Sequence, residues 1–183
     1  MNPKRVAILG AGASGLVAMK CCVDEGLVPV CFEKTSEIGG LWNYTETSDE
    51  GLACVMKSTV INTSKEMMCY SDYPIPADFP NYMHNTKVYE YFQMYAKEFK
   101  LFDYIQFQHE VLSVRRAPDF ATSGEWAVEY RNLKSADKEP VVERFQGVLL
   151  CTGHHAEKRM PKFEGLEDYQ VLQYSLKYCL RNS

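Results

Sequence analysis

Apolar residues cluster in short runs at the start of the chain, and their arrangement predicts a β-α-β unit. Residues 5–9 and 28–33 are largely apolar and are typical of strands buried within a parallel sheet. Between these runs, Leu16, Met19 and Val23 fall at helical spacing and form one apolar stripe. The two strands and the helix span about 30 residues, which is the usual length of this unit.

The middle of the chain changes from a loop-rich segment to a periodic one. Residues 34–85 are rich in glycine, serine, threonine, proline and aromatic residues and lack a long period, so we expect functional loops. Thr86 is the expected N-terminal cap of the helix that follows. Apolar residues at helical spacing predict that this helix packs on the sheet, and they are Val88, Tyr91, Phe92, Tyr95 and Phe99.

The later part of the chain is predicted to form strands. Residues 110–116, 125–131 and 141–145 alternate with turn-rich segments, which predicts a small antiparallel meander. Residues 148–151 are almost wholly apolar and precede a Thr-Gly pair, so we expect a buried strand that returns to the parallel sheet. The expected fold class is therefore α/β, an open Rossmann-like sheet with an inserted antiparallel β-meander.

Composition and charge narrow the class of protein. The 183 residues are 46% hydrophobic and 24% charged, which is ordinary for a globular domain with a real core. The formal charge is −4 and the basic residues are scattered, so we expect no binding to nucleic acid. Cysteines at irregular spacings indicate reduced thiols in a cytosol-facing protein. Cys151, His154 and His155 lack a second ligand pair at a familiar spacing, so we expect no metal site.

Three glycines directly after the first predicted strand form the pattern G-x-G-x-x-G at the start of a helix. In this context Gly10 permits a tight turn, Gly12 lets the backbone approach a pyrophosphate, and Gly15 allows close contact between helix and strand. The helix N-terminus adds N–H donors and the positive end of its dipole. The apolar stretch 6–19 also suits a signal peptide, but glycines at these offsets favour a nucleotide fold.

Glu33 ends the second predicted strand, where an acidic side chain can accept hydrogen bonds from both hydroxyls of a ribose. The alternative is a solvated carboxylate at the end of a strand. We favour the ribose because the fingerprint requires an acidic residue at about this offset. A carboxylate would repel a 2′-phosphate, so NADP fits this first site poorly and FAD or NAD remains.

Four further motifs carry a resemblance to a known family. They are Glu-Ile-Gly-Gly-Leu-Trp at 37–42, Asn-Thr-Ser-Lys-Glu-Met-Met at 62–68, Pro-Asn-Tyr-Met-His-Asn at 80–85 and Cys-Thr-Gly-His-His at 151–155. With these motifs the chain resembles the animal flavin-containing monooxygenases, of the N-oxide-forming dimethylaniline monooxygenase type. The resemblance extends from about residue 6 to residue 168.

The resemblance implies FAD and NADPH as cofactors, and small-molecule amines or sulfides with O2 as substrates. It implies that NADPH reduces FAD, that oxygen then forms a C4a-hydroperoxyflavin, and that a soft nitrogen or sulfur nucleophile takes the distal oxygen. Asn62 is the implied catalytic residue, because its amide can donate to the peroxide and accept from a neighbour. His154 and His155 are left with structural roles. The implied cofactor-binding residues are Gly10, Ala11, Gly12, Ala13, Ser14, Gly15, Glu33, Gly40, Leu41, Trp42, Asn62 and Thr63.

The family also has parts that this sequence lacks. A second G-x-G-x-x-G for NADPH and a hydrophobic carboxyl-terminal anchor are not present, and residues 169–183 diverge from the family pattern. We expect residues 1–168 to form an incomplete FAD-binding domain that is truncated before the NADPH-binding domain, so the isolated chain would be inactive. The resemblance implies the cytosolic face of the endoplasmic reticulum membrane, and the cytosol for this chain alone. The alternative is a catalytically inactive truncated isoform that binds FAD weakly or acts only as an interaction partner.

Overall fold

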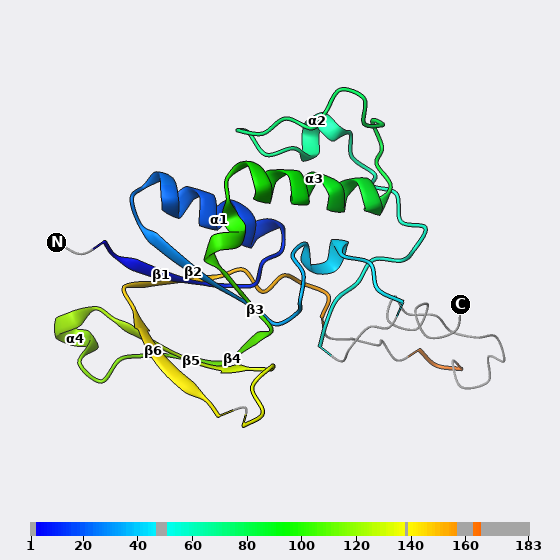
Figure 1. The fold of residues 1–183 in the computed structure, drawn as a ribbon. Helices are drawn as coiled ribbons and strands as arrows, with labels where there is room; N and C mark the ends of the chain where they lie inside the picture. The colour runs from blue at the N-terminus through cyan, green and yellow to red at the C-terminus, as the bar shows by residue number, and fades with distance from the viewer. Residues whose placement is uncertain (1–2, 47–50, 138, 157–162, 166–183) are drawn as a thin grey trace.

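The computed structural model describes residues 3–46, 51–137, 139–156 and 163–165. A parallel sheet lies between a layer of helices and a small antiparallel sheet, so the described chain has three layers (Figure 1). This arrangement confirms the expected α/β fold class with its inserted meander. The strands and helices are, in chain order, β1 (Arg5–Leu9), α1 (Ala13–Asp24), β2 (Val28–Glu33), α2 (Lys65–Met68), α3 (Asn85–Glu98), β3 (Ile105–Phe107), β4 (His109–Arg116), α4 (Phe120–Ser123), β5 (Trp126–Asn132), β6 (Val141–Phe145) and β7 (Gly147–Leu150).

The parallel sheet has the order β3-β2-β1-β7, and both strands of the predicted β-α-β unit begin and end where the sequence pattern places them. Strand β1 lies between β2 and β7 and is buried on both faces. Val6 and Ile8 join the core beneath the helices, whereas Ala7 and Leu9 join a second core that faces the meander. Burial on two faces explains why this strand is a continuous apolar run rather than an alternating one.

Helix α1 covers one face of the parallel sheet, but its buried side is rotated from the expected stripe. Gly15, Leu16, Met19 and Cys22 are buried, whereas Val23 is 38% exposed. The prediction for Val23 is therefore wrong. The close contact of the first helical turn with the end of β1 sets the rotation of the helix, and a cysteine, which packs as a small hydrophobe, occupies the inward position.

Helix α3 begins at Asn85, and its cap is His84 rather than Thr86. The Nδ1 atom of His84 accepts a hydrogen bond from the Thr86 N–H at 3.4 Å and lies 3.0 Å from the Thr86 hydroxyl oxygen. Cap preferences favour threonine over histidine, which explains the error in the sequence analysis. The helix packs mainly against α1 and against 3-10 turns at 40–42 and 101–104, and it reaches the sheet through the core that they share.

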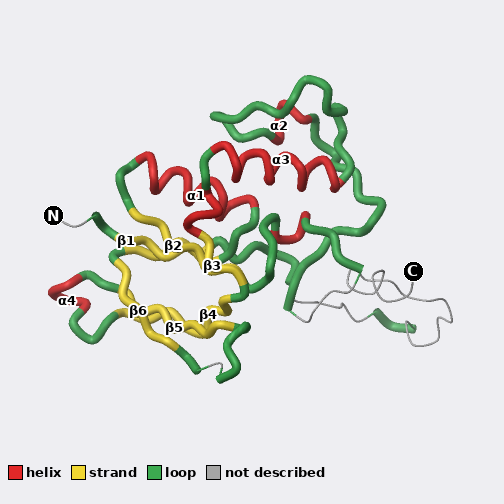
Figure 2. Tube along the Cα trace, in the orientation of Figure 1, coloured by secondary structure: helices red, strands yellow, loops and turns green. Residues whose placement is uncertain are grey.

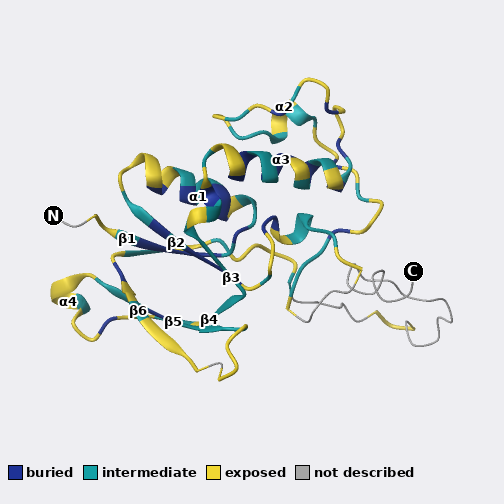
Figure 3. Ribbon diagram, viewed as in Figure 1, coloured by how far each residue is buried: buried dark blue, intermediate teal, exposed yellow. Residues whose placement is uncertain are grey.

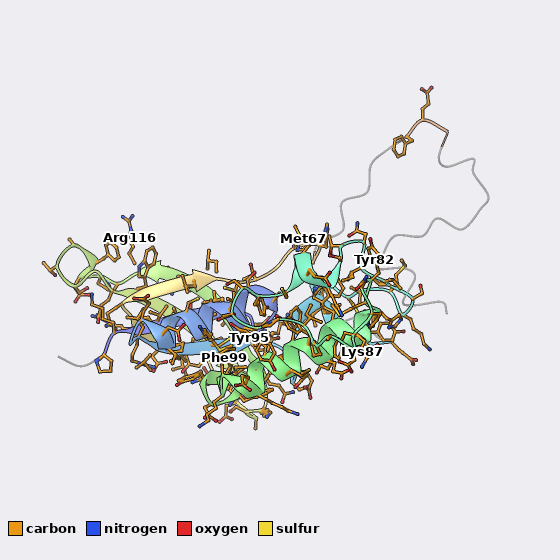
Figure 4. The ribbon with its side chains drawn as sticks, turned by 90° about the horizontal axis from the view of Figure 1, so that it is seen from above. Met67, Tyr82, Lys87, Tyr95, Phe99 and Arg116 are labelled. Atoms are coloured by element: carbon orange, nitrogen blue, oxygen red, sulfur yellow. The ribbon has the colours of Figure 1, made fainter. Side chains whose placement is uncertain are left out.

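The buried side of α3 is strongly aromatic. Tyr95 lies 4.8 Å from Phe99 and 4.5 Å from Tyr70 between ring centroids, and these rings pack beneath the loop that follows α2. Figure 3 shows buried positions along the inward side of α3, and Figure 4 shows Tyr95 and Phe99 among the surrounding side chains. Each buried ring removes a large apolar area from water and contributes on the order of 2 kcal/mol. This aromatic layer therefore anchors the long loop to the helices.

Strands β4, β5 and β6 form the antiparallel sheet in that order, which confirms the predicted meander. Phe145 and Val128 point toward the parallel sheet, where the Phe145 ring centroid lies 5.9 Å from that of Phe32. Strand β7 pairs with β1 as expected, but it is not buried. Leu149 is 40% and Leu150 is 72% exposed, because β7 is the edge of the sheet within the described residues.

Most of the chain between β2 and α3 is loop, as the sequence predicts (Figure 2). Two parts of this loop segment reach the start of α1, since the Gly39 N–H donates to the Ala11 carbonyl oxygen and the Tyr70 hydroxyl donates to the Ala13 carbonyl oxygen. Within the part of the chain that the structure describes, no helix is both long and apolar enough to cross a membrane.

Candidate functional site

The glycine turn between β1 and α1 is shaped by close backbone contacts. Gly10 has a φ of 101°, and its N–H donates a hydrogen bond to the Phe32 carbonyl oxygen at 2.9 Å. A Cβ atom on Gly10 would lie 2.6 Å from the Cys151 carbonyl oxygen, and one on Gly15 would overlap the Gly10 carbonyl oxygen. These contacts confirm the tight turn at Gly10 and the close approach of helix and strand at Gly15.

Gly12 stands in a different environment from the other two glycines of the turn. The nearest atom to an added Cβ would be the Gly40 Cα at 3.6 Å, which is an ordinary contact, so protein packing does not require glycine here. Gly12 caps α1 without a side-chain hydrogen bond, and among the described residues no acceptor contacts the N–H groups of Ala13 and Ser14. The open space and the free donors together form a cradle for an anionic group.

Ala11 joins three of the predicted site segments. Its N–H donates to the Glu33 Oε2 at 2.8 Å, and its carbonyl oxygen accepts from the Gly39 N–H at 2.9 Å. Because Ala11 is fully buried, these two hydrogen bonds are protected from competition with water. The glycine turn, the end of β2 and the second glycine pair are therefore held together at one point.

The Glu33 carboxylate is 7% exposed and is largely occupied by protein donors. Oε1 accepts from both the N–H and the hydroxyl of Thr35, each at 2.8 Å, and Oε2 accepts from Ala11. A carboxylate has about four lone-pair sites, so roughly one remains, on Oε2. Glu33 can therefore accept from one ribose hydroxyl, and simultaneous bonds to two hydroxyls exceed its free capacity.

The second glycine pair lies directly against the first turn. Gly39 and Gly40 have φ values of 101° and 54°, and a Cβ on Gly40 would lie 3.3 Å from the Gly12 Cα. A Cβ on Gly39 would lie 2.9 Å from the ring of Tyr89, which comes from α3. The Tyr89 hydroxyl donates to Glu37, and burial raises its pKa, so it stays a donor at neutral pH. Tyr89 thus packs against Gly39 and holds the segment that precedes it through Glu37.

A pocket of about 600 Å³ is lined by Trp42, which ends the 3-10 turn that begins at Gly40. It brings together Trp42, Asn62 and Thr63, three of the residues that the family resemblance implies, whereas Leu41 does not line it. Asn62 and Thr63 are exposed, and no hydrogen bond to their side chains is made by the described residues. The other residues that line the pocket are Thr59, Val60, Ile61, Met68 and His155.

Tyr70 links the loop around this pocket to the start of α1. Its hydroxyl donates to the Ala13 carbonyl oxygen at 2.6 Å, and its N–H donates to the Tyr91 hydroxyl at 2.8 Å. Burial raises the pKa of Tyr70, so the hydroxyl remains a donor. The first turn of α1 is therefore supported by a residue that lies far along the chain.

The sequence analysis missed Thr35, Tyr70, Tyr89 and His155 as site residues. A threonine two positions after the strand-end glutamate is the one local signal, because such a residue can hydrogen-bond back to the carboxylate. His155 lines the pocket with a φ of 63°, its ring centroid 4.1 Å from that of His154. No local pattern indicates the roles of Tyr70 and Tyr89, because each depends on a contact between distant segments.

Taken together, the parallel sheet, the glycine turn at its end and the buried strand-end carboxylate define a dinucleotide-binding α/β domain. The match to a known family is more specific. A family model described as flavin-binding monooxygenase-like matches residues 3–178, and the chain belongs to this family. Its members are oxidoreductases that use FAD and NADPH.

Two curated relatives show the extent of the similarity. Flavin-containing monooxygenase 5 of Oryctolagus cuniculus is 56% identical over 172 residues, which are 93% of this chain and 32% of the relative. Dimethylaniline monooxygenase [N-oxide-forming] 2 of Mus musculus is 49% identical over 169 residues, which are 91% of this chain and 31% of the relative. The chain thus spans about a third of the length of these relatives.

Solved structures agree with the family assignment. S-allyl-L-cysteine S-oxygenase from Allium sativum superposes with a TM-score of 0.79 at 28% identity, covering 90% of this chain and 40% of that one. An open structure of cyclohexanone monooxygenase superposes with a TM-score of 0.67 at 21% identity, covering 91% of this chain and 30% of that one. The second comparison supports the fold alone.

Proposed function

We propose that residues 1–168 belong to an FAD-binding domain and that the site described above holds FAD. In this proposal the turn from Gly10 to Gly15 binds the pyrophosphate through its free N–H groups, and Glu33 accepts a hydrogen bond from the ribose. The observation that carries the proposal is the pair of hydrogen bonds at Ala11, which brings the glycine turn, Glu33 and the second glycine pair into one cradle.

The flavin ring is proposed to lie in the pocket that contains Asn62 and Thr63, with Gly40, Leu41 and Trp42 as the adjoining segment. Bound FAD would supply the redox chemistry, and the protein would orient it and exclude water. Asn62 would donate through its amide N–H and accept through its carbonyl oxygen at the reacting edge. Its side chain is free to do so, since no described residue hydrogen-bonds to it.

We propose that the whole protein oxygenates soft nitrogen or sulfur nucleophiles with O2 and NADPH. The support is the family membership and the printed activities of two relatives, an N-oxide-forming dimethylaniline monooxygenase and an S-oxygenase. The proposed location is the cytosolic face of the endoplasmic reticulum. Support for a reducing compartment comes from the six cysteines among the described residues, all of which are free thiols.

A second candidate is an FAD-binding chain without oxygenase activity of its own. The chain spans about a third of the length of the curated relatives it matches, so activity of these 183 residues alone is a separate proposal from activity of the whole protein. Two measurements on the purified 183-residue chain distinguish the two candidate functions. The first is the visible absorbance of bound flavin, and the second is NADPH oxidation in the presence of a tertiary amine or a thioether. Bound flavin without NADPH turnover would support the second candidate, and turnover coupled to substrate oxidation would exclude it.

Replacement of Gly12 by alanine tests the cradle directly. The added methyl group meets only ordinary contacts, with the Gly40 Cα at 3.6 Å and the Gly40 N at 3.8 Å, so the fold should persist, yet it occupies the space beside the free N–H groups. We expect FAD binding to weaken by at least about tenfold, because a pyrophosphate must approach this backbone closely. The measurement is titration of the chain with FAD by fluorescence.

Gly147→Ala is the matched control, because its Cβ also meets ordinary contacts, with the Val6 side chain at 3.6 Å and 3.7 Å. This variant lies away from the cradle in β7 and should bind FAD like the wild type. Unchanged FAD affinity in Gly12→Ala, with both variants folded, would contradict the proposed pyrophosphate site.

A further inference from the structure

The turn that carries the two polar pocket residues, 62–63, is fixed at both of its ends. On one side the Ile61 N–H donates to the Met83 carbonyl oxygen at 2.9 Å, and on the other the Lys65 N–H donates to the Asn81 carbonyl oxygen at 2.8 Å. Both acceptors lie on the same opposite segment. The position of that segment therefore determines where the turn stands in the pocket.

The side chain of Lys65 joins the start of α2 to the turn at 76–79, which comes directly before this opposite segment in the chain. Its ammonium group donates to the carbonyl oxygens of Ala77 and Phe79, each at 2.7 Å, and to that of Pro76 at 3.3 Å. A lysine has three donors, and all three point to the backbone of one short turn. Within the described chain Lys65 forms no salt bridge, and its charge acts on the neighbouring Glu66 carboxylate only at longer range, where it helps to lower the pKa of that group. Lys65 therefore links the start of α2 to the backbone of the turn at 76–79, and we call this set of hydrogen bonds the clamp.

From these contacts we infer that Lys65 is a positioning residue that sets the location of Asn62 and Thr63 at the flavin end of the site. The inference rests on the proposed function. Removal of the ammonium group leaves three backbone carbonyls without their charged donor and loosens the turn at 76–79. The acceptor at Asn81 then moves with that turn, and the pocket residues lose their fixed position.

The pyrophosphate end of the site is held by other contacts. Ala11 is fixed by Glu33 and Gly39, and the start of α1 is fixed by Tyr70, none of which bonds to Lys65. Loss of the clamp should therefore affect the two ends of the proposed cofactor unequally. ADP contacts only the pyrophosphate and ribose end, whereas FAD contacts both ends.

The test is Lys65→Met in the 183-residue chain, because methionine keeps the length of the side chain and removes its donors. Lys57→Met is the control, since Lys57 is an exposed lysine of the same loop region whose side chain forms no hydrogen bond or ion pair with the described residues. We measure the dissociation constants of FAD and of ADP and the visible circular dichroism of bound FAD. Lys65→Met should weaken FAD binding about tenfold, change the flavin dichroism and leave ADP binding within about twofold.

Two results would overturn the role of Lys65. One is an equal loss of FAD and ADP binding in Lys65→Met, which indicates general destabilisation. The other is FAD binding and flavin dichroism identical to those of the wild type and of Lys57→Met. A wild-type chain that binds neither FAD nor ADP would instead refute the proposed function, so the failures of the two proposals are distinguishable.

Discussion

Replacement of Gly15 by alanine is expected to lower the free energy of unfolding by more than about 3 kcal/mol, a large part of the stability of a small domain. The added Cβ would overlap the Gly10 carbonyl oxygen and lie 2.9 Å from the carbonyl carbon. Both atoms belong to the backbone, so α1 must move away from the end of β1. That movement separates Leu16 and Met19 from the core. Denaturant unfolding followed by circular dichroism measures the loss.

Gly12→Ala provides the comparison for this experiment, because both glycines belong to the same turn. Its added Cβ meets nothing closer than 3.6 Å, so its unfolding free energy should stay within about 1 kcal/mol of the wild-type value. The two variants should therefore differ in what they lose. Gly15→Ala should lose free energy of unfolding, whereas Gly12→Ala should keep its stability and bind FAD weakly. Equal unfolding free energies for the two variants would show that helix-strand contact does not require Gly15.

Local patterns were sufficient to predict the framework of the molecule. The strands at 5–9 and 28–33 are buried on both faces and so consist of unbroken apolar runs, and their bounds are confirmed. The meander was predictable because its strands alternate with turn residues. Gly15 was predictable because its closest contact is with Gly10 in the same turn. The positive φ of Gly10 also belongs to that turn, although the carbonyl oxygen that leaves no room for a side chain there comes from the distant Cys151.

Other features depend on packing between distant segments, and no local pattern predicts them. Val23 and Cys22 are both compatible with an apolar stripe, and only the contact of α1 with β1 decides which one is buried. The exposure of Leu150 depends on the place of β7 in the sheet. Tyr70 reaches Ala13 across 57 positions of the chain, so its role in supporting α1 is invisible in the sequence.

The position of Glu33 could be predicted from the sequence, whereas its contacts with other residues could not. The sequence indicates an acidic residue at the end of β2, and the structure adds that the carboxylate already accepts from Ala11 and Thr35. These contacts orient the carboxylate before any ligand binds. The same carboxylate therefore fixes the glycine turn and, in the proposed function, binds the ribose.

Glu33→Gln is expected to weaken FAD binding by roughly 10- to 100-fold and to lower the free energy of unfolding by about 1–3 kcal/mol. The Ala11 N–H points to one carboxylate oxygen and the Thr35 N–H to the other. A glutamine has a single oxygen, so in either orientation its NH2 group faces one of these N–H donors. One of the two N–H groups therefore loses its acceptor, and the ribose loses a charged acceptor. Fluorescence titration with FAD and thermal unfolding without FAD measure the two effects.

Glu98→Gln is the control for this substitution, because Glu98 is exposed at the end of α3 and its side chain forms no hydrogen bond or ion pair with the described residues. Glutamate-to-glutamine exchange there should change neither FAD affinity nor stability beyond about 0.5 kcal/mol. A Glu33→Gln chain that unfolds at the wild-type temperature and binds FAD with wild-type affinity would contradict both roles of the carboxylate. If stability falls while FAD affinity is unchanged, Glu33 fixes the turn but does not contact the ribose.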